Sequence, residues 1–143
     1  MIHAQIFQPI IVLAIWTMVM WVWMYATRIP AMQKSDDIDA PNLKGGTGKD
    51  LDGVLPESVQ WKAHNYNHLH EQPTVFYAVA LVLAMIGQGD GMNALLAWMY
   101  VGLRIIHSLV QVTANRVMVR FILFALSSLV LMGLILHAAL ALF

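Results

Sequence analysis

Two apolar runs that almost touch decide the fold of this chain: MNALLAWMYVGLRIIHSLVQVTA (residues 92–114) and RVMVRFILFALSSLVLMGLILHAALAL (residues 116–142). A membrane-spanning helix needs about 20 predominantly apolar residues, and each run supplies them. Only Asn115 separates the runs, which leaves no room for a long loop. The pair therefore predicts two antiparallel helices inside a membrane, joined by a tight turn.

An earlier apolar run predicts a helix over about residues 5–28. Its far end carries the aromatic residues Trp16, Trp21, Trp23 and Tyr25. Such side chains collect where a membrane meets water. Arg28 and Pro30 should end this helix at that surface. No basic residue precedes the apolar run, so it reads as a retained helix rather than a cleaved signal peptide.

The remaining helix is predicted over residues 57–86, with Pro56 at its start. Its first half is polar and amphipathic, and its second half is apolar. Pro73 lacks an N–H and frees the carbonyl of Leu69, so we expect a kink there.

The composition agrees with a membrane protein. Of 143 residues, 59% are hydrophobic and 11% are charged, whereas soluble domains carry about 25% charged residues. Zero formal net charge argues against a nucleic-acid partner, and the absence of cysteine excludes disulfides. We predict one all-α domain over residues 1–143, an integral membrane four-helix bundle in contact with lipids, with a polar loop over residues 29–56.

Apart from Arg104, which lies within an apolar run, the basic residues lie on one side of the predicted bundle. The first loop and its borders carry Arg28, Lys34, Lys44, Lys49 and Lys62, and the hairpin turn is followed by Arg116 and Arg120. The opposite side carries no Lys or Arg. Since cytoplasmic loops are rich in Lys and Arg, we expect the loop over residues 29–56 in the cytoplasm and both termini on the other side.

Polar residues recur three, four or seven positions apart on three of the helices, so that each set shares one helix face. The sets are Gln60, His64, Asn67, His68 and Glu71; Arg104, His107, Ser108, Gln111 and Asn115; and Arg116, Arg120 and Ser127. Three polar faces at the same membrane surface predict one hydrated pocket between the helices. The excess of arginine over acid suggests an anionic ligand such as a carboxylate-bearing peptide or a lipid headgroup.

Glu71 and Arg104 are the ionisable residues placed deepest in apolar segments. A charge in lipid is expensive and usually has a partner, so we expect the two to pair, directly or through a ligand. A purely structural role, in which the polar groups join helices, remains the alternative. We expect no metal, because only His64 and His68 have chelating spacing and a site needs three or four ligands.

The segment KAHNYNHLHEQP (residues 62–73) resembles the second-helix motif of the MAPEG family, the membrane-associated proteins in eicosanoid and glutathione metabolism. Arg104 and His107, followed by Arg116 and Arg120, resemble the third-helix Arg-x-x-His of that family and its downstream arginine. The resemblance implies a homotrimer with a cytoplasm-facing pocket between subunits. It also implies glutathione as a possible co-substrate.

Carried over by the resemblance, Arg120 is the arginine that stabilises a thiolate and is the expected catalytic residue. The expected ligand-binding residues are Asn67, Glu71, Arg104, His107, Gln111, Arg116, Arg28 and His64. An adjacent guanidinium lowers the pKa of a thiol, and the thiolate is the nucleophile. The expected activity is a glutathione transferase or peroxidase reaction on a lipophilic small molecule.

The chain departs from the family pattern around this site. Glu71 lies four residues after Asn67 rather than three. Tyr66, Gln111 and Phe121 stand where arginine, tyrosine and a small hydroxyl residue occur in some of the enzymes. The resemblance is thus to a bacterial-type branch in an inner membrane, with its termini in the periplasm. Two other functions stay open: a non-catalytic binder of lipids or small molecules, and an accessory subunit of a larger complex.

Overall fold

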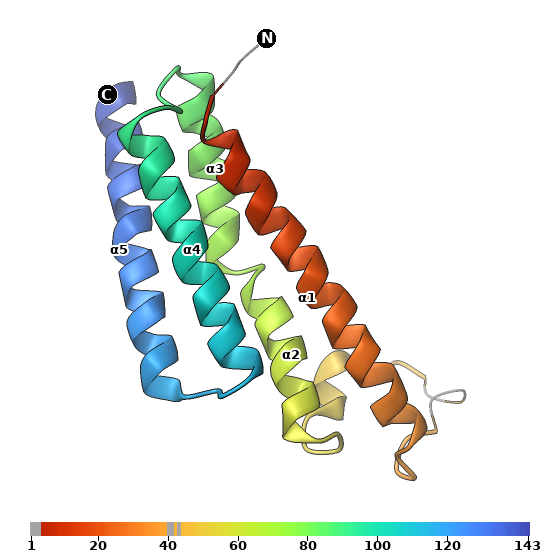
Figure 1. The fold of residues 1–143 in the computed structure, drawn as a ribbon. Coiled ribbons are helices and arrows are strands. Elements are labelled where there is room, and N and C mark those ends of the chain that lie inside the picture. The colour runs from red at the N-terminus through yellow and green to blue at the C-terminus, as the bar shows by residue number, and fades with distance from the viewer. Residues whose placement is uncertain (1–3, 40–41, 43) are drawn as a thin grey trace.

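The computed structural model describes residues 4–39, 42 and 44–143, and within them the chain is helical, without a strand. The elements are α1 (Phe7–Gln33), the short 3-10 helix η1 (Gly48–Leu51), α2 (Glu57–His68), α3 (Gln72–Met85), α4 (Met92–Val112) and α5 (Val117–Leu142). Figure 1 shows α2 and α3 following one another along one broken rod, beside the rods of α1, α4 and α5. The predicted all-α class is confirmed.

Three helices, α1, α4 and α5, are long and apolar enough to cross a membrane. With 14 residues, α3 is too short alone, since a rise of 1.5 Å per residue gives it about 21 Å against a hydrocarbon core of about 30 Å. In Figure 1, α2 lies below α3, and only the two helices together are about as long as the neighbouring helices.

The kinked helix predicted over residues 57–86 is instead two helices, because the chain leaves the helical path at residues 69–71. The amide of His70 turns back to the carbonyl of Asn67 at 2.9 Å, and Glu71 has ψ −101°. Pro73 lies in the first turn of α3, where a missing N–H has no intrahelical partner to lose. The proline therefore starts a new helix rather than kinking an old one.

The first helix also differs from its expected bounds. It continues through Arg28 and Pro30 to Gln33. A proline inside a helix removes one intrahelical hydrogen bond. Pro30 lies in the last turn, is exposed, and still accepts a hydrogen bond from the amide of Lys34 at 3.2 Å.

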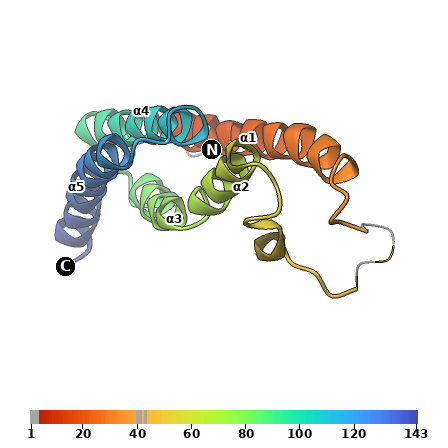
Figure 2. The ribbon, with the colours of Figure 1, turned by 90° about the horizontal axis from the view of Figure 1, so that it is seen from below.

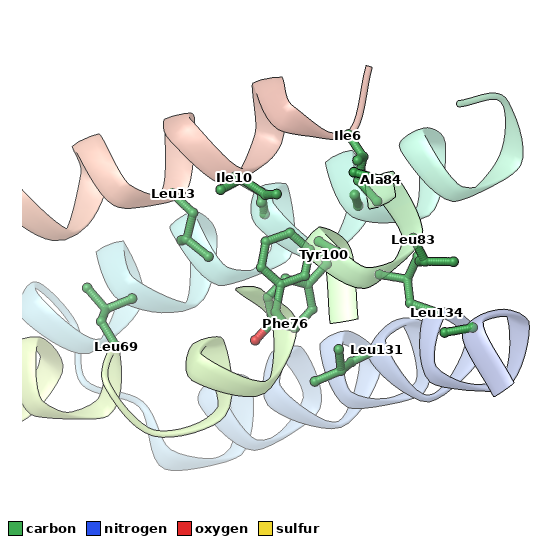
Figure 3. Packing of buried hydrophobic residues seen from close by; sticks show 14 of the residues in the cluster. Ile6, Ile10, Leu13, Leu69, Phe76, Leu83, Ala84, Tyr100, Leu131 and Leu134 are labelled. Carbon is green, nitrogen blue, oxygen red and sulfur yellow. The ribbon is translucent and has the colours of Figure 1, made fainter. Parts of the chain in front are cut away.

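The helices pack in an arc, with α1 and α4 along one side and α5, α3 and α2 along the other (Figure 2). Leu13 of α1, Leu83 of α3 and Leu134 of α5 are fully buried between them. Figure 3 shows Phe76 and Tyr100 at the centre of this packing. Their rings stack with centroids 4.5 Å apart and planes 18° apart, which joins α3 to α4.

The outer faces of α1 and α5 are apolar and exposed. On α1, Ile15 is 58% exposed and Val22 57%; on α5, Phe121 is 64% exposed and Leu140 73%. A soluble monomer rarely presents such extended apolar surface, so these faces are suited to lipid or to another subunit.

The start of α1 is fixed to the α3–α4 turn. The amide of Ile6 donates to the carbonyl of Gly89 at 2.9 Å, and the amide of Gln5 donates to Asp90 Oδ1 at 2.8 Å. The end of α5 lies at this same end of the molecule, whereas residues 113–116 and η1 lie at the other (Figure 1). The described part of the basic loop and the hairpin turn thus lie at one end of the molecule, as expected from the sequence.

Candidate functional site

Polar side chains of α4 are buried on the face that meets α2. Arg104 and Ser108 are fully buried, and His107 and Gln111 nearly so. The helical repeat places them together because they follow one another at intervals of one turn. Asn65, fully buried on α2, donates from Nδ2 to Ser108 Oγ at 2.6 Å. The α2–α4 contact is therefore a polar seam within an apolar bundle.

Arg104 is joined to the end of α2. Its Nη2 donates to His68 Nδ1 at 2.8 Å and to the carbonyl oxygen of His68 at 3.3 Å. Within the described residues, its Nε and Nη1 have no hydrogen-bond partner. A guanidinium has five N–H donors, so a buried one with spare donors can bind a further acceptor. Arg104 is thus both a link between helices and a group that suits an anion.

Glu71 does not form an ion pair with Arg104 in the part of the chain that the structure describes. Its side chain is 67% exposed at the break between α2 and α3, and its nearest basic partner is His68, with Oε2 3.7 Å from Nε2. The predicted direct pairing is wrong because the break turns Glu71 outward and leaves His68 between the two charges.

A cavity of about 230 Å³ lies between the end of α2, the C-terminal part of α4 and the start of α5; we call it the histidine cavity. It is lined by His68, His107, Val117, Arg120, Phe121 and Phe124. The two imidazoles stack, with centroids 4.9 Å apart and planes 16° apart. Arg104 Cζ lies 5.9 Å from the centre of the Phe124 ring, so the buried guanidinium stands close behind this cavity.

Arg120 is held at the edge of the histidine cavity. Its Nη1 donates to Asn115 Oδ1 at 2.6 Å. Asn115 ends the hairpin turn in the left-handed region, with φ 46°, which asparagine tolerates better than most residues. The turn therefore fixes both the start of α5 and the direction of the Arg120 side chain.

A second cavity of about 310 Å³ lies between α1, η1 and α2; we call it the loop cavity. Among its lining residues are Tyr25, Arg28, Lys49, His64 and Asn67. Its walls are held by two contacts that cross from the helices to the loop. Arg28 Nη2 donates to the carbonyl of Gly48 at 3.1 Å, and His64 Nε2 lies 3.0 Å from Asp52 Oδ1.

The loop beside this cavity has its own fixed turn. The amide and hydroxyl of Thr47 donate to Asp50 Oδ2 at 2.6 and 3.0 Å. These two hydrogen bonds hold the pKa of the exposed Asp50 carboxylate below its ordinary value, and the bond from the backbone amide has the larger effect. Gln60 Nε2 then donates to the carbonyl of Leu51 at 3.0 Å, which connects η1 to α2.

The expected site residues thus divide between two places in one chain. His107 and Arg120 line the histidine cavity with Arg104 behind it, while Arg28, His64 and Asn67 line the loop cavity. Three remain apart from both linings: the exposed Glu71 at the break, the buried Gln111 in the seam, and the exposed Arg116 before α5. Within this chain, the expected site residues therefore do not line one common pocket.

His68 belongs to the expected polar face of the second helix but not to the expected ligand-binding residues, although it contacts Arg104 and His107 and lines the histidine cavity. Its place on the polar face of the second helix, three residues before Glu71, was a usable signal. Over the described ranges, no group of three or more His, Cys, Asp or Glu is arranged to hold a metal.

The apolar helices, with a polar seam and a cationic cavity between them, define an integral membrane helical protein. A family model described as MAPEG family matches residues 6–140. The chain belongs to the MAPEG family. Neither the curated proteins nor the solved structures gave a match.

Proposed function

We propose that this protein is a homotrimer of a bacterial inner membrane that uses glutathione or a similar thiol on lipophilic electrophiles. The observation that supports this best is the histidine cavity. It places Arg120 beside His68 and His107, with a second buried arginine behind them. A thiolate is an anion, and such a cationic surrounding favours it over the thiol.

The division of the expected site residues supports a pocket between subunits. Within one chain, the histidine cavity and the loop cavity lie on different parts of the bundle. A neighbouring chain that presents its loop cavity to the histidine cavity would complete one longer site. Arg28, His64 and Asn67 would then hold the charged ends of the thiol peptide, and Arg120 its sulfur.

The apolar lining supports an electrophile that enters from the bilayer. Val117 is 75% exposed and Phe121 64%, and both line the histidine cavity. They lie on α5, which is among the helices fit to cross the membrane. A hydrophobic substrate dissolved in lipid can thus reach the arginine without first crossing water.

The reaction would follow from these positions. The guanidinium of Arg120 stabilises the thiolate, whose sulfur attacks an electrophilic carbon or a peroxide oxygen. With an aryl halide, a carbon–sulfur bond forms and the carbon–halogen bond breaks, releasing halide. With a lipid hydroperoxide, the sulfur attacks the terminal oxygen, the O–O bond breaks, and the lipid leaves as an alcohol after taking up a proton. A second thiol then reacts with the resulting sulfenic acid to form a disulfide and water.

Replacement of Arg120 tests this function. The Arg120→Ala variant should lose turnover of glutathione with chlorodinitrobenzene or with a lipid hydroperoxide, and Arg120→Lys should retain part of it. Removing one such electrostatic group typically costs on the order of 100-fold in rate. Lys34→Ala is the matched control, because Lys34 is an exposed cation at the end of α1 on the same side. An unchanged rate in Arg120→Ala, with assembly intact, contradicts the role.

A non-catalytic binding protein is the second candidate, and one observation favours it. Gln111 is only 4% exposed, lies in the α2–α4 seam and lines neither cavity. The histidine cavity accordingly presents three polar side chains, His68, His107 and Arg120, to a peptide with several charged ends. Calorimetry separates the two functions: micromolar binding of glutathione supports the enzyme, and retention of a lipophilic ligand without thiol binding supports the carrier.

A further inference from the structure

The two ring nitrogens of His68 face groups of opposite charge. Nδ1 lies 2.8 Å from Arg104 Nη2, and Nε2 lies 3.7 Å from Glu71 Oε2. A guanidinium can only donate, so Nδ1 must accept and carries no proton. The neutral ring then holds its hydrogen on Nε2, on the side of the Glu71 carboxylate.

Burial increases stepwise along these three residues. The side chain of Glu71 is 67% exposed and that of His68 21%, while Arg104 is 0% exposed. The imidazole of His68 thus contacts both Glu71 at the surface and Arg104 inside the bundle. A carboxylate beside Nε2–H makes Nδ1 a better acceptor, as it does for histidines that bind metals.

The orientation of His68 also determines one wall of the histidine cavity. Its ring stacks on His107 at 4.9 Å and tilts against Phe124 with centroids 5.7 Å apart. A ring that turned away from Arg104 would lose both packing contacts. The position of His107 at the cavity therefore depends on the two contacts that His68 makes at its nitrogens.

We propose that His68 is a positioning residue, which transmits the charge of Glu71 to Arg104 and holds His107 in the wall of the histidine cavity. For what the cavity binds, this inference rests on the proposed thiol function. The arrangement of the three residues does not depend on it. Glu71 then influences the ligand from outside the cavity, without touching it.

The arrangement can be tested without any ligand. In the protein labelled with ¹⁵N-histidine and held in detergent micelles, the nitrogen shifts of His68 should report a neutral ring protonated at Nε2. The His68→Asn variant assigns the signal. Glu71→Gln should shift the Nε2 signal, whereas Glu57→Gln, which changes an exposed acid at the start of α2, should not. A ring protonated at Nδ1 overturns the proposal, as does a signal that ignores Glu71→Gln.

The effect on binding is tested by a double-substitution cycle with glutathione, followed by calorimetry. His68→Asn keeps an acceptor near the place of Nδ1 but has no group in the place of Nε2. Glu71→Gln should weaken binding about 3- to 10-fold in the otherwise unchanged protein and have no further effect beside His68→Asn. Equal losses in both backgrounds would mean that Glu71 touches the ligand itself, which overturns the positioning role. If the unchanged protein does not bind glutathione, the proposed function fails, and the nitrogen shifts still decide the arrangement of the three residues.

Discussion

Asn65 on α2 donates a hydrogen bond of 2.6 Å to Ser108 on α4, and both side chains are fully buried. Within the described residues, Asn65 Oδ1 has no partner. The bond lies at the level of the polar seam, between the buried Arg104 and Gln111 along α4. It is thus a specific contact between the helices that carry the two histidines of the cavity.

Removing this bond should weaken the α2–α4 contact. Ser108→Ala leaves the amide of Asn65 without an acceptor, and we expect a loss of about 0.5–2 kcal/mol in the free energy of unfolding, the range of other hydrogen bonds between membrane helices. Asn65→Ala should cost a similar amount, and the double variant little more. Unfolding in mixed detergent micelles measures this, and additive losses would show that the bond contributes nothing of its own.

Gly89 should not tolerate a side chain. A Cβ at this position would lie 2.7 Å from Ala4 Cβ and 2.9 Å from Ile6 Cγ2, so the start of α1 would have to move. We expect Gly89→Ala to destabilise the protein by about 1–3 kcal/mol. Gly102→Ala is the control, since that position in α4 has open space and should gain up to about 1 kcal/mol of helix propensity. A neutral Gly89→Ala would contradict the packing of α1 on the α3–α4 turn.

The orientation in the membrane can be measured with single cysteines, because the chain has none of its own. Asp36 follows α1 at the basic end, and Gln88 lies in the α3–α4 turn at the other; both are exposed. A maleimide that cannot cross the membrane should label Gln88→Cys in spheroplasts and Asp36→Cys only after permeabilisation. The reverse pattern would place the basic loop outside the cell and rule out a cytoplasm-facing pocket.

Acid should open the turn at Thr47. The Asp50 carboxylate has a lowered pKa because it accepts bonds from the amide and hydroxyl of Thr47. Its contribution is therefore complete above the ordinary aspartate pKa of about 3.9 and is lost as the pH falls through the lower value in the folded protein. The amide shift of Thr47 should titrate with a midpoint below that ordinary value. In Asp50→Asn this titration should vanish; its persistence would assign it to another group.

The oligomeric state decides whether a pocket between subunits exists. We expect native mass spectrometry from gentle detergent to give three times the 16.0 kDa chain. The apolar hollow on α1, formed by Ile11, Ile15, Met18 and neighbouring residues of that helix alone, is a surface that another subunit would cover. A monomer under conditions that retain glutathione binding would exclude the intersubunit site and leave the histidine cavity as the whole site.

The sequence predicted the parts of the fold that the membrane itself dictates. The lengths of the runs around residues 92–142 follow from the thickness of the hydrocarbon core, and the single residue between them leaves only a hairpin. The burial of Arg104, His107 and Gln111 on one face of α4 follows from helical spacing. These expectations needed no knowledge of the neighbouring helices.

The partner of Arg104 could not be predicted in this way. In a continuous helix, Glu71 and His68 share a face, and charge alone would select the acid. The backbone instead breaks at residues 69–71, which leaves Glu71 exposed at the surface while His68 contacts Arg104. Pro73 predicts an irregularity in the helix near residue 73, but it does not determine which residue leaves the helical path. The choice depends on tertiary packing around the break.

The break has a further electrostatic consequence for Arg104. Peptide dipoles leave the C-terminus of a helix partly negative, and its last carbonyls lack intrahelical donors. At the end of α2, the carbonyl of His68 is such a group, and it accepts from Arg104 Nη2 at 3.3 Å. The interrupted rod thus brings the negative end of a helix dipole to a cation inside the bundle, where an unbroken helix would offer none. Arg104 serves in turn as the C-terminal cap of α2. Replacing it should therefore fray the end of that helix, in addition to removing the buried cation behind the histidine cavity.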